Sequence, residues 1–114
     1  MSLITSQVTL SAAGVSAPVA YAPFLGPMSF MQPLVLISLS NGANLTYNVE
    51  VTGDNINAPG YVAANGIWVP FTGLVGLNAS TVSTLGAAVQ ALRLHVTAYT
   101  SGSATLQFVQ VVSP

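Results

Sequence analysis

The fold is decided by residues 34–51, which read LVLISLSNGANLTYNVEV. Two apolar runs, 34–39 and 45–51, flank Asn41-Gly42, and the second run alternates between apolar and polar residues. Such alternation is typical of a β-strand with one buried face, and Asn-Gly between two runs is the strongest short-range signal for a β-hairpin. The first run is apolar on both faces, so we expect both faces to be covered. Residues 34–51 therefore predict a hairpin in an all-β protein.

A second hairpin is predicted near the end of the chain. Apolar and polar residues alternate through 92–99, and Ser101-Gly102 separates this run from a last apolar segment, 104–112. In that segment the alternation slips at Val109, which would be explained either by a β-bulge or by a strand that is covered on both faces. We therefore expect two hairpins, each with a glycine in its turn.

Turn-rich spacers between short apolar segments indicate the fold class. Further segments at 3–10, 16–22 and 67–71 are separated by stretches rich in Gly, Pro, Asn and Ser. The stretch 80–91 also fits a helix, but its glycine and its β-branched residues disfavour one. A chain of 114 residues is long enough for one core. We predict a single all-β domain, residues 1–114, folded as an antiparallel β-sandwich of about seven strands, jelly-roll-like or immunoglobulin-like.

Very low charge is the most unusual property of this sequence. Charged residues make up 3% of it, against roughly 25% in ordinary domains. One arginine and no lysine cannot neutralise the phosphates of a nucleic acid, and without cysteine the chain forms neither a disulfide nor a thiolate metal site. No apolar run reaches the roughly 18 residues of a membrane-spanning helix, and the first residues do not read as a secretory signal. We therefore expect neither nucleic acid nor membrane as a partner.

The same composition favours an assembly. A net charge of −1 gives almost no repulsion between copies of the chain. The alternative is a monomer that Ser, Thr, Asn and Gln alone keep in solution. We expect instead that part of the outer surface packs against copies of the chain or against a partner.

The few ionisable side chains are Glu50, Asp54, Arg93 and His95. A Ser-His-Asp arrangement would need three groups within hydrogen-bond reach, and nothing near His95 resembles the turn that carries such a serine, so no catalytic residue is assigned. Glu50 and Arg93 lie on the polar faces of predicted strands and can pair across the sheet, unless they bind a neighbouring subunit or face solvent. Asp54 begins an Asp-Asn-Ile-Asn turn with too few carboxylates for a calcium site. We predict no metal and no cofactor.

Large apolar residues outside the main strands mark a candidate interface. Five of them lie in the proline-bounded segment 23–33, which should be a surface loop and which we expect to be buried against another chain. Trp68 and its neighbours form a platform for stacking sugars, an anchor inserted into a partner, or a plug at one end of the sandwich. Residues 1–10 are a candidate assembly arm. The predicted interface residues are Ile4, Phe24, Leu25, Met28, Phe30, Met31, Tyr61, Trp68 and Phe71.

The order of these features is similar to that in small virion proteins of tailed bacteriophages. The motifs concerned are VTLSAA at 8–13, SAPV at 16–19, LTYNV at 45–49, GIWVP at 66–70, LRLHVT at 92–97 and ATLQF at 104–108. The likeness is one of pattern and covers most of the chain. The resemblance implies a β-sandwich subunit without enzymatic activity that decorates or cements the capsid, or a related head-fibre protein.

The resemblance also implies partners and a place in the particle. A cement subunit contacts the major capsid protein or another virion protein, and it often forms homo-oligomers, here a trimer on a local three-fold axis. It is made in the host cytoplasm and ends on the capsid surface of the virion. Two alternatives remain, namely a tail, collar or connector protein and a carbohydrate-binding module that uses Tyr61, Trp68 and Tyr99.

Overall fold

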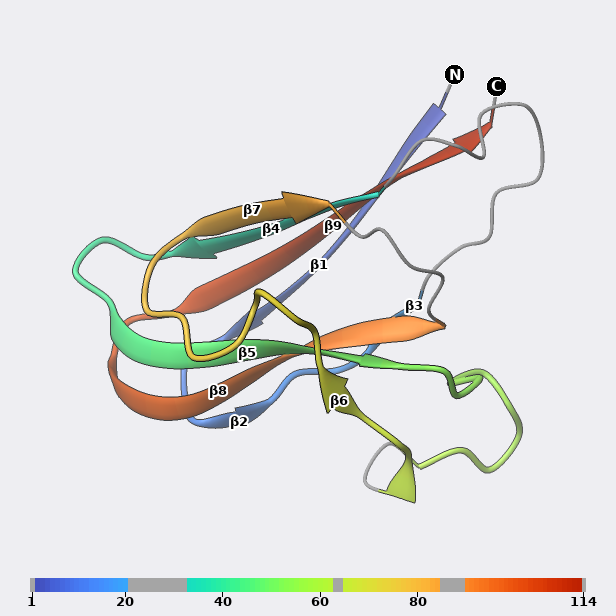
Figure 1. Cartoon of the computed structure of the whole chain (residues 1–114), viewed down its shortest axis with the longest axis horizontal. Coiled ribbons are helices and arrows are strands. Elements are labelled where there is room, and N and C mark those ends of the chain that lie inside the picture. The colour runs from blue at the N-terminus through green and yellow to red at the C-terminus, as the bar shows by residue number, and fades with distance from the viewer. Residues whose placement is uncertain (1, 21–32, 63–64, 85–89, 114) are drawn as a thin grey trace.

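The computed structural model of the chain describes residues 2–20, 33–62, 65–84 and 90–113. Within these residues it contains nine strands and no α-helix (Figure 1), and hence no helix with the length and hydropathy needed to cross a membrane. The strands are β1 (Ser2–Leu10), β2 (Gly14–Val15), β3 (Val19–Ala20), β4 (Leu34–Leu39), β5 (Asn44–Thr52), β6 (Val69–Pro70), β7 (Thr81–Thr84), β8 (Ala91–Ser101) and β9 (Ala104–Ser113). The all-β prediction is confirmed.

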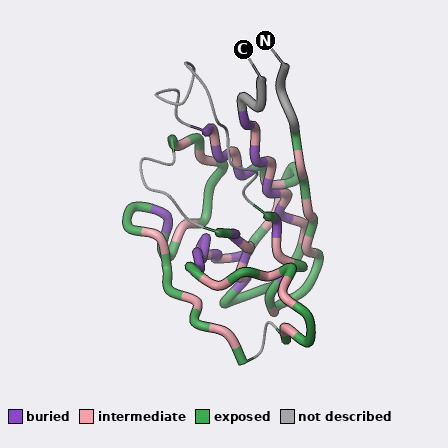
Figure 2. The backbone as a smooth tube through the Cα atoms, turned by 90° about the vertical axis from the view of Figure 1, so that its right-hand side faces the viewer, coloured by how far each residue is buried: buried purple, intermediate pink, exposed green. Residues whose placement is uncertain are grey.

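The strands form two antiparallel sheets that pack face to face (Figure 1). The four-stranded sheet has the order β1-β9-β4-β7, and the five-stranded sheet has the order β2-β8-β5-β6, with β3 also paired to β8. Along the strands of both sheets, buried residues alternate with half-buried or exposed ones (Figure 2), and the buried hydrophobic residues form one core cluster. The predicted antiparallel β-sandwich is therefore confirmed.

The strand order identifies the type of sandwich. Both β2 and β3 pair with the same side of β8, Val15 opposite His95 and Val19 opposite Leu92, so they act as one interrupted strand. With these two counted together, the sheets read first, eighth, third, sixth and second, seventh, fourth, fifth along the chain. This is the order of a jelly roll. Of the two predicted types, the fold is the jelly-roll one.

The two predicted hairpins are wrong, because each joins strands of different sheets. In the first turn Ala43 N donates to Ser40 O at 3.0 Å, and only Gly42 has a positive φ, of 75°. A two-residue hairpin turn of the Asn-Gly type needs positive φ at both central residues, whereas positive φ at the second one alone is a type II turn. The chain therefore crosses from one sheet to the other here, and it does so again at Ser101-Gly102.

The two crossings, residues 40–43 and 101–103, lie side by side because β4 pairs with β9 and β5 pairs with β8. Ser40 N donates to Ser103 O, and Ser103 N donates to Ser40 Oγ, both at 2.9 Å. Gly102 has a φ of 89°, and a Cβ atom placed on it would lie 2.5 Å from Ala43 Cβ. Only glycine fits where these two turns touch.

The core fills the space between the sheets. Phe108 and Leu106 of β9 face Tyr47 and Leu94 of the other sheet, all of them almost completely buried. The pairing of β9 with β1 and β4 continues through Val109 without a shift, so there is no bulge at Val109; the irregularity lies between Ser2 and Leu3 of β1. The slip in alternation arises because Gln110 takes a position on the buried face.

The first residues of the chain belong to the four-stranded sheet. From Ser2 to Leu10, β1 pairs with β9, so the predicted assembly arm is a strand in the sheet of its own chain. A contribution of β1 to an assembly stays a prediction. The strand β4 is buried on its inner face at Val35 and Ile37, but Leu34 and Leu36 on its outer face are only half-buried within the chain.

Candidate functional site

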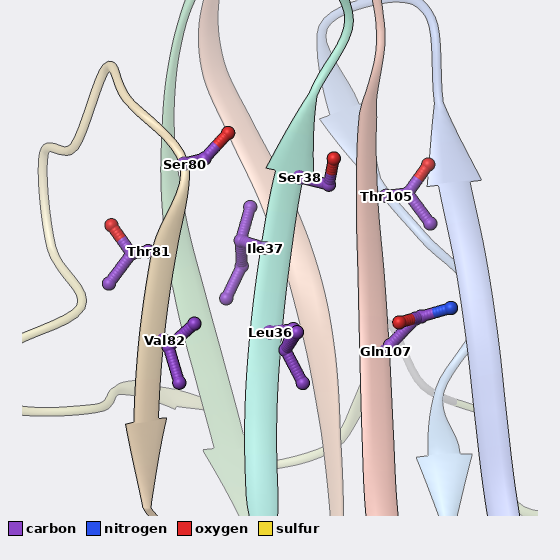
Figure 3. Close-up of a pocket in the computed structure, with 8 residues that line it drawn as sticks. All are labelled: Leu36, Ile37, Ser38, Ser80, Thr81, Val82, Thr105 and Gln107. Carbon is purple, nitrogen blue, oxygen red and sulfur yellow. The ribbon is translucent and has the colours of Figure 1, made fainter.

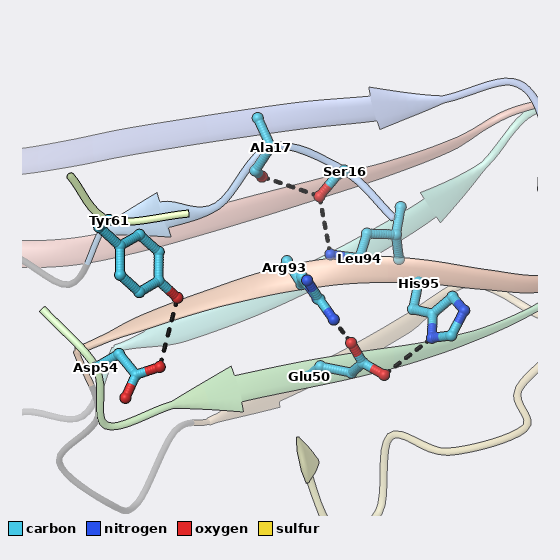
Figure 4. Close-up of polar contacts among 8 residues, drawn as sticks. All are labelled: Ser16, Ala17, Glu50, Asp54, Tyr61, Arg93, Leu94 and His95. Carbon is cyan, nitrogen blue, oxygen red and sulfur yellow. Dashed lines mark hydrogen bonds and ion pairs between the residues drawn. The ribbon is translucent and has the colours of Figure 1, made fainter. Parts of the chain in front are cut away.

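Glu50, Arg93 and His95 meet on the outer face of the five-stranded sheet. Glu50 of β5 stands directly opposite Arg93 of β8, and His95 is two residues further along β8. Arg93 Nε lies 2.7 Å from Glu50 Oε1, and His95 Nδ1 lies 2.9 Å from Glu50 Oε2 (Figure 4). The predicted pairing of Glu50 and Arg93 across the sheet is confirmed, and His95 completes the cluster.

Burial and charge act in opposite directions on Glu50, which is only 8% exposed. Burial raises the pKa of Glu50, but the hydrogen bonds from His95 and Arg93, with their charges, hold this pKa below its ordinary value of 4.5. Both carboxylate oxygens are engaged, one by each basic side chain. Glu50 therefore ties two positions of β8 to β5 as an anion.

Trp68 covers this cluster from the loop that precedes β6. The guanidinium carbon of Arg93 lies 4.3 Å from the centre of the Trp68 ring, a distance typical of a cation–π contact. The indole Nε1 is buried, and no hydrogen-bond acceptor for it is found among the described residues. Trp68 thus lies against the outer face of the five-stranded sheet. Of the three alternatives for this residue, the plug at one end of the sandwich does not fit this position.

Asp54 organises the loop that leads away from β5. Its Oδ2 accepts a hydrogen bond from Ile67 N at 2.8 Å. It also accepts a longer one from Tyr61 Oη at 3.5 Å (Figure 4). Asn57 N donates to Asn55 Oδ1 at 3.0 Å, which is a side-chain turn. The predicted turn at Asp54 is confirmed. The part of the chain that the structure describes holds no group of three side chains suited to a metal ion.

The predicted interface residues do not all lie in one place in the structure. Tyr61 and Trp68 lie close together around Gly66, because a Cβ on that glycine would meet both side chains. Phe71 is half-buried against the core, and its N–H donates to Val49 O at 2.7 Å. Ile4 lies within β1. The remaining five, all in 23–33, lie outside the described residues: Phe24, Leu25, Met28, Phe30 and Met31.

The three aromatic residues of the sugar-platform hypothesis do not come together. Tyr99 pairs with Leu45, whereas Arg93 beneath Trp68 pairs with Glu50 near the other end of β5. Six residues along a strand correspond to about 20 Å. Tyr99 Oη instead donates to Gly102 O at 3.0 Å. Only Tyr61 and Trp68 are neighbours.

Two polar residues that hold the fold together were not predicted from the sequence. Ser16 Oγ accepts a hydrogen bond from Leu94 N at 3.0 Å and so replaces a main-chain partner in the gap between β2 and β3. Asn48 Oδ1 accepts one from Gly76 N at 2.7 Å and holds the loop after β6 along β5. A serine two residues before Pro18 is the only signal for the first, and nothing in the sequence marks the second.

A shallow hollow of about 300 Å³ lies on the outer face of the four-stranded sheet (Figure 3). Leu36 and Val82 form its apolar part, and Thr105 and Gln107 add polar groups. The three charged residues and His95 lie on β5, β8 or the loop after β5, so no charge approaches this face from its own sheet. The hollow can hold an apolar or neutral group.

No known protein family, curated protein or solved structure matches the chain. The strand order defines it as a small jelly-roll protein. Its two outer faces differ, since one carries a compact charged cluster and the other is uncharged. A fold by itself does not determine a function, so the surfaces must carry the proposal.

Acidification should unfold this protein through Glu50. Because the pKa of Glu50 is lower in the folded chain than its ordinary value, its stabilising effect is complete above pH 4.5 and is lost as the pH falls through the folded value. Glu50→Gln should cost about 1.5–3 kcal/mol at neutral pH, the range for hydrogen bonds to charged groups, and should flatten the acid dependence. Urea unfolding across a pH series measures both effects. If the free energies of unfolding of the unmodified chain and of Glu50→Gln fell in parallel below pH 4.5, Glu50 would not be the group responsible for the acid sensitivity.

Proposed function

We propose that this chain is a structural protein of a tailed-bacteriophage virion, a non-enzymatic subunit that decorates or cements the capsid. It acts by adding contact area between neighbouring shell proteins. The proposal starts from the resemblance to small phage virion proteins and gains support from the jelly-roll fold, which viral capsid proteins share with lectins and other classes. Its partners are the major capsid protein or another virion protein.

The uncharged outer face of the four-stranded sheet is the observation that carries the proposal. Rows of residues cross this face, and one row runs from Val82 through Leu36 and Gln107 to Gln7. Val82 is 63% exposed, although it is apolar. Burying such a surface contributes about 25 cal/mol per Å². Contacts of this kind contain few charges for salt to screen, which suits a subunit that must stay bound to a particle.

Two exposed valines provide a matched test of this face. Val82 lies on the outer face of the four-stranded sheet and Val75 is 50% exposed in the loop along β5. Val82→Lys should lower incorporation into particles by about tenfold, because losing roughly 1.5 kcal/mol of apolar burial corresponds to that factor. Val75→Lys should incorporate like the unmodified chain. Equal incorporation of both variants, measured by mass spectrometry of purified particles, would reject this face as the capsid contact.

Copy number in the particle separates the remaining possibilities. Quantitative mass spectrometry should give a copy number comparable with that of the major shell protein. A number comparable with that of the portal or tail proteins would favour a tail, collar or connector protein instead. Absence from particles would refute the virion proposal, and a glycan screen with Trp68→Ala as control would then test the carbohydrate-binding alternative.

A further inference from the structure

Three of the four sheet edges are protected against pairing with another chain. One edge strand of the four-stranded sheet, β7, has four residues. One edge strand of the five-stranded sheet, β6, has only two, and one of them is Pro70. The opposite edge of the five-stranded sheet consists of β2 and β3, which have two residues each and are separated by a segment that contains Pro18. Short strands and proline are common devices against edge-to-edge association.

The fourth edge, β1, has none of these devices. It is nine residues long and reads SLITSQVTL, without charge or proline. Its ladder with β9 is regular from Leu3 to Leu10. Among the described residues β9 is its only neighbouring strand, so within this part of the chain the main-chain groups on the other side of β1 pair with no strand. A long, neutral and regular edge of this kind is a template for another strand.

The sequence of β1 is complementary to itself in antiparallel orientation. Thr5, Gln7 and Thr9 are exposed on the outer face, while Ser6, Val8 and Leu10 alternate with them on the inner side. With a two-fold axis at Gln7, each residue faces one of the same side, namely Gln7 opposite Gln7, Thr5 opposite Thr9 and Ser6 opposite Val8. No like charges meet, because the strand has none.

The polar rows of the outer face continue across this axis. Gln107 Nε2 donates to Gln7 Oε1 at 2.9 Å, and Thr9 Oγ1 lies 2.9 Å from Thr105 Oγ1. The amide nitrogen of Gln7 can donate onward to Gln7 of a second copy, which extends the row of glutamines through both molecules. Self-complementarity about a two-fold axis is what an isologous dimer requires.

We propose that two copies of this chain pair through β1, in antiparallel register centred on Gln7. The two four-stranded sheets then form one continuous sheet with β7 of each copy at its ends. Because β7 is short, growth stops at two copies. This inference concerns self-association only and does not rest on the virion proposal.

Light scattering of the purified full chain tests the dimer. The expected mass is twice the 11.6 kDa of one chain. Gln7→Lys should raise the dissociation constant by at least about tenfold, because like charges directly opposite each other destabilise a strand pair. Thr84→Lys, an exposed position on the opposite edge, should leave the dimer intact. A single-chain mass for the unmodified protein, a three-chain mass, or a dimer unaffected by Gln7→Lys would each overturn the proposal.

A cysteine probe keeps the test independent of the lysine variant. The chain has no cysteine, so Gln7→Cys would introduce the only thiol. Opposite Cα atoms in antiparallel strands are about 4.5–5.5 Å apart, within the range that a disulfide spans. Mild oxidation should therefore link Gln7→Cys into a covalent dimer and leave Thr84→Cys as single chains. Equal cross-linking of the two variants would overturn the register.

Discussion

Gly102→Ala should lower the free energy of unfolding by about 2–5 kcal/mol. A left-handed backbone costs a residue with a Cβ about 1–2 kcal/mol, and overpacking adds about 1–3 kcal/mol. Both apply here, since Gly102 has a φ of 89° and an added Cβ would lie 2.5 Å from Ala43 Cβ and 2.8 Å from Ser40 Oγ. The atoms in the way belong to the neighbouring crossing, which the Ser40–Ser103 hydrogen bonds hold in place. Urea unfolding measures the loss.

Gly73→Ala is the matched control for this substitution. Gly73 has nearly the same φ, 93°, but an added Cβ would meet nothing within 4 Å. It should lose only the backbone part, about 1–2 kcal/mol. If Gly102→Ala and Gly73→Ala lost the same free energy of unfolding, the closeness of Ala43 to position 102 would add nothing to the cost of a Cβ there.

Tyr47→Ala should cost about 3–5 kcal/mol, the range found when large aromatic residues are truncated in a core. Tyr47 is 0% exposed and packs in the middle of the sandwich. Its hydroxyl donates to Ala79 O at 2.7 Å, and its main chain exchanges hydrogen bonds with Leu77. The side chain therefore ties β5 to the segment that leads into β7. Such a loss is a large part of the total of about 5–15 kcal/mol for a domain.

Two further variants show how much of the stabilisation by Tyr47 comes from its ring, its hydroxyl and its burial. Tyr47→Phe keeps the ring and should lose only about 1 kcal/mol, the net value of one hydrogen bond. Tyr99→Ala removes a tyrosine that is 37% exposed and should cost much less than Tyr47→Ala. Thermal and urea unfolding compare the three. A Tyr47→Phe variant as unstable as Tyr47→Ala would mean that the hydroxyl, and not the ring, carries the stabilisation.

Most of the strands could be predicted from the sequence, but β7 could not, and neither could the partners of the strands. Alternation shows which residues share a face, as with Glu50 on the polar side of β5, and local spacing is enough for that. Whether two consecutive strands pair or cross between sheets depends on turn geometry. At Asn41-Gly42 the deciding quantity is the φ of Asn41, and the same dipeptide is compatible with either sign. The first hairpin prediction therefore failed because of the φ angle of one residue. The second failed in the same way, since the chain also crosses between the sheets at Ser101-Gly102.

The candidate site could be predicted in part, because alternation shows which side chains lie on the same face of a sheet. Glu50 and Arg93 were paired correctly because each lies on the polar face of a regular strand. The stacking of Trp68 on Arg93 depends instead on the path of the loop that Asp54 shapes through Ile67 N. Loop paths have no periodicity from which they can be inferred. The regular strands therefore indicated which side chains share a face, and the irregular segment between them gave no such indication.

The pairing of β1 with β9 joins the first and the last of the described strands, which lie side by side in Figure 1. During synthesis β1 leaves the ribosome well before its partner β9, because the strands β2 to β8 lie between them in the chain. Until then β4 also lacks β9, its central neighbour. Sheets built from such distant segments form slowly, and chains with unpaired strands are prone to aggregate. The four-stranded sheet therefore cannot be completed until β9 has left the ribosome, and β1 and β4 lack this neighbour, and are prone to aggregate, through most of the synthesis of the domain.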